Sequence, residues 1–455
     1  MLNKLALFGG NPSVHNHSSL RISWPIINND DYFSIKKVFK EKEFSGRGSK
    51  EIINLEKEFA NFHGVSYATA LNSGTAALHT ALVSLGIKAG DEVLVTSFSF
   101  IASAMAILHN QSIPVFVDID PNTYNIAPSE IEKHITSRTK AIIVVHMHGI
   151  PAELNPIIAL CKKYNLKLIE DVAQAPGARY HGKLVGTFGD AAAFSLMSQK
   201  NLATCGEAGI LINKTLSQKN RAEMTRIYGE IIKNKESRVY NSFTLGWNYT
   251  LNPLQATMAR TQLKKFNNLT KSIQKKGKKF SNALKKFHWI ETPKTPVNSE
   301  SVYHFFRIRL KSEMFGYKNG GRFRQAIQDA LNAEGLNVRH YQNTPLPCHP
   351  VFQNKEAFGR GLPWSLNKEK VVYKISDYPN TLNVIENTLV IGAIGLSPSY
   401  LLCEGTIEKY IKGLNKIDKN MNLILKYADN LDYIPPWEKI PMQSDSYNSK
   451  YELLL

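Results

Sequence analysis

One lysine lies in a polar loop between two apolar stretches. Lys200 stands between Gln199 and Asn201, after a predicted strand at 191–195 and before a Gly-Glu-Ala-Gly turn at 206–209. A loop at the end of buried strands holds such an amine in partly desolvated surroundings, where loss of its proton makes it a nucleophile toward carbonyl groups in Schiff-base formation. An ordinary surface lysine is the alternative, and other stretches of the chain bear on the choice.

Two of these stretches could bind the ring and the phosphate of a cofactor. Asp171 ends the apolar run LIE, and a carboxylate at a strand end can pair with a protonated pyridine nitrogen. Capping of the following segment 172–175 is the alternative. Residues 72–78, NSGTAAL, turn from a predicted strand into a helix, whose free N–H groups and positive dipole end favour phosphate. A simple helix cap by Ser73 or Thr75 is the alternative.

Other polar and aromatic residues follow predicted strands. Phe100 could stack on a flat ligand, although a phenylalanine more often packs in a core. Gln174 lies three residues after Asp171, within reach of the same ligand, and Ser195 ends the strand before Lys200. The amide of Asn248, in the stretch LGWNY, could donate to a phosphate.

Neither the histidines nor the cysteines predict a metal site. His146 and His148 would share one face if both lay on a strand, but no third ligand is evident. The four cysteines are widely spaced, as expected of reduced thiols, at positions Cys161, Cys205, Cys348 and Cys403.

The motifs LIEDVAQAPG (168–177), NSGTAAL (72–78) and LGWNY (245–249), with Phe194-Ser195 and Lys200, resemble those of the DegT/DnrJ/EryC1/StrS family of pyridoxal-phosphate aminotransferases. They occur in the family's order and spacing, and the resemblance runs from about residue 5 to about residue 417. It implies the α/β architecture of PLP-dependent transferase fold type I, with a mostly parallel central sheet flanked by helices and a smaller α+β C-terminal domain. It also implies a homodimer with shared active sites.

The resemblance assigns a role to each candidate residue. Lys200, the catalytic residue, would bind pyridoxal 5′-phosphate covalently and shuttle protons. Phe100 would stack on the ring, Asp171 would pair with its nitrogen, and Gln174 would contact its phenolic oxygen. The phosphate would lie at the start of the helix. The implied cofactor-binding set is Ser73, Gly74, Thr75, Ala76, Phe100, Asp171, Gln174, Ser195, Lys200 and, from the partner subunit, Asn248.

The implied reaction is amination of a nucleotide-linked keto-sugar or a keto-cyclitol, with glutamine or glutamate as donor, in amino-sugar or secondary-metabolite biosynthesis. Stretches 5–12 and 378–392 look closer to the branch that acts on cyclitol-type rings. Two positions depart from the family pattern: Ala208 stands where a glycine is usual, and Thr250 where an arginine that contacts substrate is frequent. Sugar dehydratases of the same family are an alternative, but they carry histidine at the position of Lys200.

Composition limits the other classes of function. The chain has 455 residues, 43% of them hydrophobic, and a formal net charge of +18. No nucleic-acid-binding motif accompanies this charge, so a basic regulatory protein is the weaker alternative, and we expect a small phosphorylated substrate. A nicotinamide-dependent enzyme would need a GxGxxG turn. No apolar stretch is long enough to span a membrane or form a signal peptide, so a cytoplasmic protein is expected.

The positioning elements follow from the pattern of apolar residues. Short β-rich runs alternate with helical ones, which predicts a mostly parallel sheet covered on both faces. The strands are expected at 67–71, 92–96, 114–118, 141–146, 167–170 and 191–195, and the helices between them at 75–85, 100–109, 129–135 and 151–164. A long lysine-rich helix at 253–287, with a solvated face, leads out of this domain. We expect a loose arm at 1–20, a PLP-binding domain at 21–265, a small domain at 266–420 and a tail at 421–455, ordered through Trp437.

Overall fold

A seven-stranded, mostly parallel sheet forms the centre of the protein. The computed structural model describes residues 4–15, 20, 22–231, 238–368, 371–392 and 399–439. The strand order is β1-β9-β8-β5-β4-β2-β3, and only β9 runs antiparallel to its two neighbours. The strands span Tyr67–Leu71 (β1), Glu92–Thr96 (β2), Ile113–Val117 (β3), Thr139–Val145 (β4), Lys167–Asp171 (β5), Ala191–Ser195 (β8) and Gly209–Asn213 (β9).

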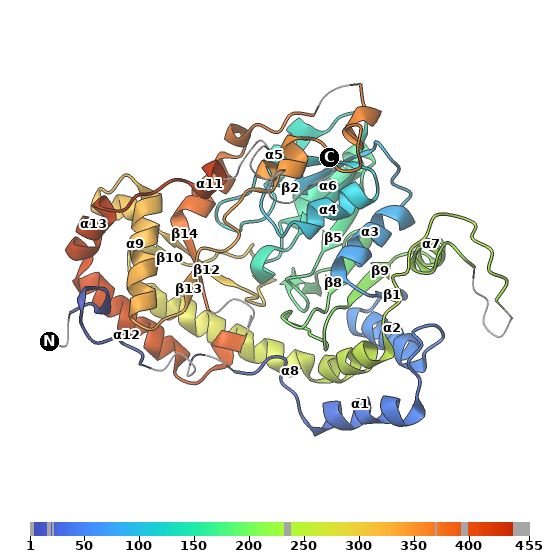
Figure 1. The fold of residues 1–455 in the computed structure, drawn as a ribbon, viewed down its shortest axis with the longest axis horizontal. Helices are drawn as coiled ribbons and strands as arrows, with labels where there is room; N and C mark the ends of the chain where they lie inside the picture. The colour runs from blue at the N-terminus through green and yellow to red at the C-terminus, as the bar shows by residue number, and fades with distance from the viewer. Residues whose placement is uncertain are drawn as a thin grey trace.

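Helices cover both faces of this sheet (Figure 1). Successive residues of β2 point to opposite faces, so that Leu94 packs in one buried cluster and Val93 and Val95 in another. The helices of the large part are α1 (Asn29–Glu41), α2 (Lys50–His63), α3 (Gly74–Ser84), α4 (Ala102–His109), α5 (Pro128–Ile131), α6 (Leu154–Tyr164) and α7 (Leu216–Arg226). The predicted fold class is confirmed.

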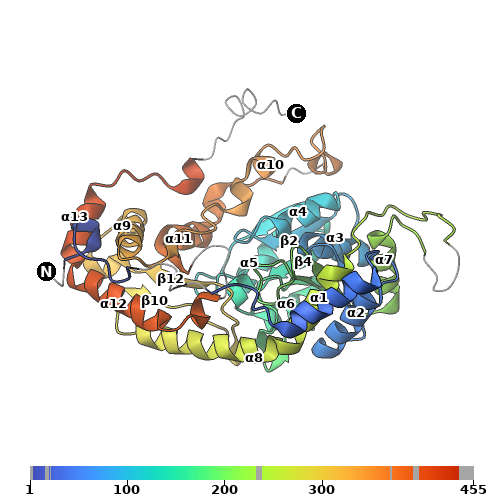
Figure 2. The same cartoon turned by 60° about the horizontal axis from the view of Figure 1, so that its bottom comes forward.

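A second, smaller α+β part lies at the far end of a long helix. Helix α8 (Pro253–Leu284) runs between the two parts in both ribbon views (Figures 1 and 2). The small part has an antiparallel sheet in the order β10-β12-β14-β13, formed by Ile290–Glu291, Phe306–Leu310, Thr388–Ile391 and Val338–Arg339. Its helices are α9 (Gly320–Ala333), α11 (Pro379–Asn387), α12 (Thr406–Lys419) and α13 (Met421–Asp429). The short α10 (Pro350–Gln353) packs on the large part instead, since Phe352 is buried beside Phe116 of β3. A third sheet joins β11 (Ser299–Glu300), β6 (Arg179–Tyr180) and β7 (Lys183–Leu184).

Both ends of the described chain pack on this framework. The N-terminal segment is not a loose arm: Leu5 and Val14 are buried in the core of the small part, and Glu334 accepts the backbone N–H of Ala6 at 2.8 Å. Trp437 is 8% exposed and packs beside Ile385. The polar stretch 444–450 lies outside the described residues, and the predicted domain boundaries remain predictions.

Several element boundaries differ from the sequence-based expectation. Strand β4 ends at Val145, so His146 and His148 follow it and do not share a strand face. Helix α4 begins at Ala102, which leaves Phe100 in a loop. The predicted helix at 129–135 is a short α5 followed by a 3-10 turn.

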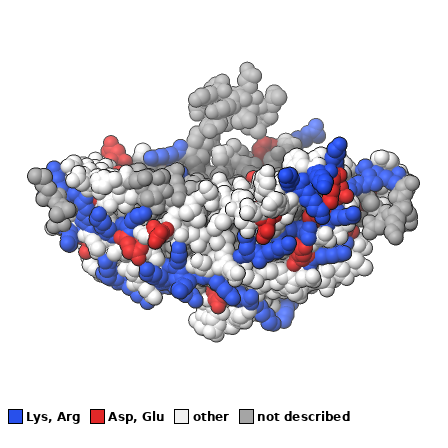
Figure 3. All heavy atoms as spheres, turned by 90° about the horizontal axis from the view of Figure 1, so that it is seen from below, with Lys and Arg blue, Asp and Glu red and all other residues white. Residues whose placement is uncertain are grey.

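The lysines of α8 largely face solvent, as the sequence indicated. Figure 3 shows that Lys and Arg side chains spread over the face of the molecule seen from below, with Asp and Glu between them. On α8, Lys264, Lys271 and Lys278 are exposed. Lys279 forms an ion pair with Glu408 of α12.

Candidate active site

The buried carboxylate Asp171 lies at the carboxyl end of β5, the edge at which open α/β sheets bind ligands. Its Oδ2 accepts the hydroxyl hydrogen of Ser103 at 2.8 Å, and its Oδ1 accepts the N–H of Ala173 at 3.1 Å. Burial raises the pKa of Asp171, although these hydrogen bonds and the charge of Lys200 oppose the rise. A cationic ligand group at this carboxylate would therefore stabilise its charged form.

The start of α3 meets the end of β8. Ser73 is the helix N-cap, and its Oγ accepts the N–H of Ala76 at 3.0 Å, so the capping role is realised. A Cβ added at Gly74 would lie 2.7 Å from Cβ of Ser195. Because residue 74 is glycine, the start of α3 can approach Ser195 closely. The hydroxyl of Ser195 therefore lies beside the backbone of the first turn of α3, which also contains Thr75.

The turn before β9 contributes to the same close packing. A Cβ at Gly209 would lie 2.1 Å from the carbonyl oxygen of Ser73. Residue 209, the last of the Gly-Glu-Ala-Gly turn, must therefore be glycine, because a side chain there would clash with the backbone of Ser73 at the start of α3. The third residue, Ala208, is fully buried, so alanine fits at the position where it departs from the family pattern.

Lys200 is partly buried in the loop after β8. Burial lowers the pKa of its amine, while the charges of Asp171 and Glu207 act in the opposite direction. Its N–H donates to the carbonyl of Met197 at 2.8 Å, and its own carbonyl accepts the indole N–H of Trp24 at 3.0 Å. The backbone of the lysine is thus held from both sides, next to the acid of β5.

Phe100 and Gln174 lie on opposite sides of Asp171 in the sequence and differ in burial. The side chain of Phe100 is 54% exposed, so it is free to cover a ligand. Ser103, one helical turn later, binds Asp171 and ties this loop to the acid. Gln174 is buried, and its Oε1 accepts the N–H of His148 at 2.8 Å.

His146 has a structural partner. Its Nε2 donates to Oε2 of Glu170 at 3.0 Å, and its Nδ1 accepts the N–H of Ala152 at 3.0 Å, so both nitrogens are used. His148 binds elsewhere, since its Nε2 accepts from Arg307 at 2.9 Å. In the described part of the chain, no group of three or more His, Cys, Asp or Glu residues could hold a metal ion.

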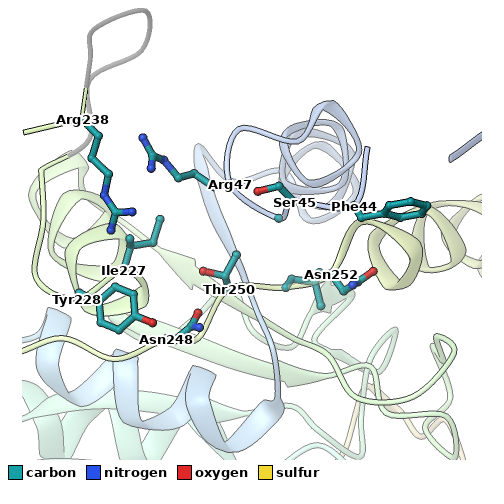
Figure 4. Close-up of a pocket in the computed structure, with 11 residues that line it drawn as sticks. Phe44, Ser45, Arg47, Ile227, Tyr228, Arg238, Asn248, Thr250 and Asn252 are labelled. Atoms are coloured by element: carbon teal, nitrogen blue, oxygen red, sulfur yellow. The ribbon is translucent and has the colours of Figure 1, made fainter. Parts of the chain in front are cut away.

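Asn248 is exposed and lines a separate cavity of about 430 Å³ (Figure 4). The cavity is also lined by Arg47, Tyr228 and Arg238, and by Thr250, at the position where arginine is frequent in the family. Among the described residues that line it, none of the other predicted site residues appears. The structure thus gathers nine of the ten candidates along one edge of the sheet and leaves Asn248 facing outward.

Residues 25–380 match the model of the DegT/DnrJ/EryC1/StrS aminotransferase family. The chain belongs to this family. It is 37% identical over 359 residues to GDP-perosamine synthase of Escherichia coli O157:H7, covering 73% of this chain and 93% of that protein. It is 38% identical over 300 residues to dTDP-3-amino-3,6-dideoxy-alpha-D-galactopyranose transaminase of Aneurinibacillus thermoaerophilus, covering 66% and 77%.

A solved aminotransferase from Psychrobacter cryohalolentis has the same fold, with a TM-score of 0.76 at 25% identity, covering 88% of this chain and all of that one. The protein is therefore an aminotransferase, and its family and structural neighbours are PLP-dependent enzymes. No helix in the described residues is both long and apolar enough to cross a membrane.

The residues of this aminotransferase fit pyridoxal phosphate. The first turn of α3 and the hydroxyl of Ser195 suit a phosphate, the buried acid Asp171 suits a pyridinium nitrogen, and Lys200 suits the aldehyde. A side chain at position 74 would occupy the space between the start of α3 and Ser195, where the phosphate would bind.

Sequence reasoning missed three residues that support the site. Ser103 had a signal, because it belongs to the serine-containing stretch that follows β2 and lies in the first turn of α4. Arg307 also had one, as a charged residue in the apolar run FFRIRL. Trp24 had none, since it reaches Lys200 from 176 residues away.

Proposed function

We propose that this aminotransferase uses pyridoxal 5′-phosphate to transfer the amino group of glutamine or glutamate to a nucleotide-linked keto-sugar or a keto-cyclitol. The proposal is supported by the charge interaction between the amine of Lys200 and the carboxylate of Asp171, and by the close approach of the start of α3 to Ser195 at the end of β8. An amine of lowered pKa, a buried acid and an anion-binding helix start are the three groups that this cofactor needs.

Each side chain then has a task. The cofactor supplies a carbonyl group that amines attack and a ring that withdraws electrons. Backbone N–H groups of Gly74 and Thr75 bind the phosphate, together with the hydroxyl of Ser195. Asp171 keeps a proton on the ring nitrogen, and the exposed ring of Phe100 covers the ring face and excludes water.

Lys200 acts twice in this proposal. The pKa lowered by burial leaves more of its amine uncharged, and so able to bond to the carbonyl carbon. When its amine is free, Nζ would be placed to hold and move the proton of the donor's α-carbon. Glu207, whose pKa burial raises, lies close enough for Lys200 to influence its charge.

Asn248 belongs to the second subunit's site in this proposal. The segment that leads to it carries apolar side chains that water would surround in a monomer: Val239 and Tyr240 are each 72% exposed, Phe243 65% and Leu245 71%. Such a cluster marks an interface. A homodimer would cover it and would bring the amide of Asn248 to the partner's cofactor phosphate.

The substrate class rests on the relatives and on charge. Related proteins are named as synthases or transaminases of nucleotide-linked amino sugars. The net charge of +18 favours a phosphorylated substrate. Two arginines line the cavity beside Asn248. The Nε of Arg238 donates to Oε2 of Glu230 at 2.6 Å, and Arg47 lies on the same cavity wall.

The test is a transfer assay with mass spectrometry. The purified protein with pyridoxal phosphate is given glutamine or glutamate and a panel of nucleotide-linked keto-sugars and keto-inositols. We expect an aminated product from one class, and none from Lys200→Ala. The exposed-lysine variant Lys88→Ala should match the wild type. Amination by Lys200→Ala at the wild-type rate would contradict the proposal.

A further inference from the structure

A buried arginine lies at the junction of the large and small parts. Arg307, on β12, is fully buried, and its Nε donates to His148 at 2.9 Å. Its Nη1 donates to the hydroxyl of Thr388 at 2.6 Å and its Nη2 to the carbonyl of Tyr341 at 2.5 Å. The ring of Phe98 lies 5.0 Å from the guanidinium. Burial lowers the pKa of Arg307 to about 10, so it remains charged at neutral pH.

The arginine fixes the state of His148. Because a guanidinium can only donate, Nε2 of His148 must accept, and the hydrogen of the neutral ring is on Nδ1. Burial first, and then the charge of Arg307, lower the pKa of His148 well below its ordinary value. His148 also has a backbone φ of +57°, a left-handed conformation that costs free energy in a residue with a side chain. The bond from Arg307 holds this conformation.

The left-handed turn at His148 directs the backbone N–H of this residue toward Gln174, at the candidate active site. The N–H of His148 donates to Oε1 of Gln174 at 2.8 Å. Since a backbone N–H can only donate, the orientation of the Gln174 amide is settled, and its NH₂ group is turned to the other side as a donor. Gln174 lies three residues after Asp171, at the same strand end.

We infer that Arg307 and His148 are positioning residues, which act through Gln174 and set its NH₂ group to donate to the ring oxygen of the bound cofactor. The inference rests on the proposed function, which supplies the cofactor. Arg307 comes from the small sheet, while Gln174 follows β5 of the large sheet. The backbone N–H of Val302, shortly before β12, donates to the carbonyl of Gly149 at 3.0 Å, next to His148. The orientation of Gln174 thus depends on how the two parts pack.

The experiment compares Gln174→Ala, Arg307→Met and the double variant, with Arg324→Met as control. Arg324 is equally buried but lies on α9, where its Nε donates to the carbonyl of Glu386 at 3.1 Å. The dissociation constant of pyridoxal phosphate, the absorption maximum of the bound cofactor and the melting temperature are measured for each protein.

Each of the two single variants should weaken cofactor binding about tenfold, the effect of one hydrogen bond, and shift the absorption band in the same direction. The double variant should resemble Gln174→Ala, because both changes remove one interaction. Arg324→Met should lower the melting temperature without changing affinity or band. If Arg307→Met does not fold, His148→Phe, with a ring that suits the neighbours Phe98 and Phe305, should give the same shift.

A band and an affinity unchanged in Arg307→Met or His148→Phe would overturn the inference, as would a double variant in which the two effects multiply. These outcomes leave the proposed function intact, since the wild type still binds the cofactor. A wild type that does not take up pyridoxal phosphate would instead refute the proposed function, and the inference with it.

Discussion

Two neighbouring acids on β5, Glu170 and Asp171, face opposite sides of the sheet and differ in the number of hydrogen bonds that their carboxylates accept. Glu170 accepts four hydrogen bonds, from His146 at 3.0 Å and from the backbone N–H groups of Gly186, Phe188 and Gly189 at 2.7–2.8 Å. Asp171 accepts two. Burial tends to raise the pKa of both, but the bonds to Glu170 bring its pKa below the ordinary value, while that of Asp171 stays above it.

The two sides of the strand therefore have different roles. The carboxylate of Glu170 is fully satisfied by protein groups and fastens the loop at 186–189 to the sheet. The carboxylate of Asp171 has capacity left for a cationic ligand group. The first should matter for stability and the second for catalysis.

The largest effect is expected on the side of Asp171. Asp171→Asn should lower kcat/KM for amino transfer about a thousandfold, because an amide cannot stabilise a positive ring nitrogen as the reaction proceeds. Steady-state kinetics with saturating pyridoxal phosphate measures this. Asp190→Asn, at the opposite end of β5 where the side chain bonds to Leu168, is the control and should remain within a few-fold of the wild type. A comparable loss in both variants would remove the distinction.

The next effect is expected on the side of Glu170. Glu170→Gln should lower the free energy of unfolding by about 3 kcal/mol, because its amide group cannot accept from the backbone donors it would face. Urea denaturation measures the change, and activity per folded molecule should stay near that of the wild type. An unfolding free energy equal to the wild-type value would show that the loop at 186–189 is held by other contacts.

Without bound cofactor, Glu170→Gln and Asp171→Asn should also change the free energy of unfolding in opposite directions. Glu170 has a folded-state pKa below its ordinary 4.5, so its contribution to stability is present above pH 4.5 and is lost as the pH falls through the folded value. Asp171 has a pKa raised above 3.8, so its contribution is present below pH 3.8 and is lost as the pH rises through the folded value. At pH 7, Glu170→Gln should therefore be less stable than the wild type and Asp171→Asn more stable. Urea titrations of the cofactor-free proteins between pH 4 and pH 8 test this, and a shift of the same sign in both would contradict it.

The contrast also shows what the sequence could predict. Lys200, Asp171 and the motif at 72–78 are local signals at strand ends, and the structure places them along one edge of the sheet as expected. The partners of Glu170 could not be foreseen, because the loop at 186–189 reaches it only through tertiary packing. The same holds for Trp24, which contacts the carbonyl of Lys200.

Two errors had physical causes. The strand predicted at 141–146 was one residue too long, because the apolar run of β4 continues up to His146, but the strand ends at Val145 and the chain turns left-handed at His148. The segment before residue 21 read as a loose arm because it is short and contains two glycines. Leu5 and Val14 nevertheless supply apolar side chains that the small core buries.

The smallest effect is expected at Ser103. Ser103→Ala removes one of the two hydrogen bonds to Asp171, and should lower kcat/KM about tenfold, the low end of the range for a single bond to a charged group. Ser99→Ala is the matched control, since the hydroxyl oxygen of Ser99 lies 3.1 Å from that of Ser103, and it is Ser103 that donates to Asp171. Equal kinetics in the Ser103→Ala variant and the wild type would show that Ala173 suffices to orient Asp171.

The central claim is that the amine of Lys200 binds the cofactor opposite Asp171. Borohydride reduction of the protein loaded with pyridoxal phosphate, followed by peptide mapping, tests it most directly. The account predicts one phosphopyridoxyl group per chain, on the peptide that contains Lys200, and none on Lys200→Ala. Stoichiometric labelling of another lysine, with Lys200 left unmodified, would contradict it.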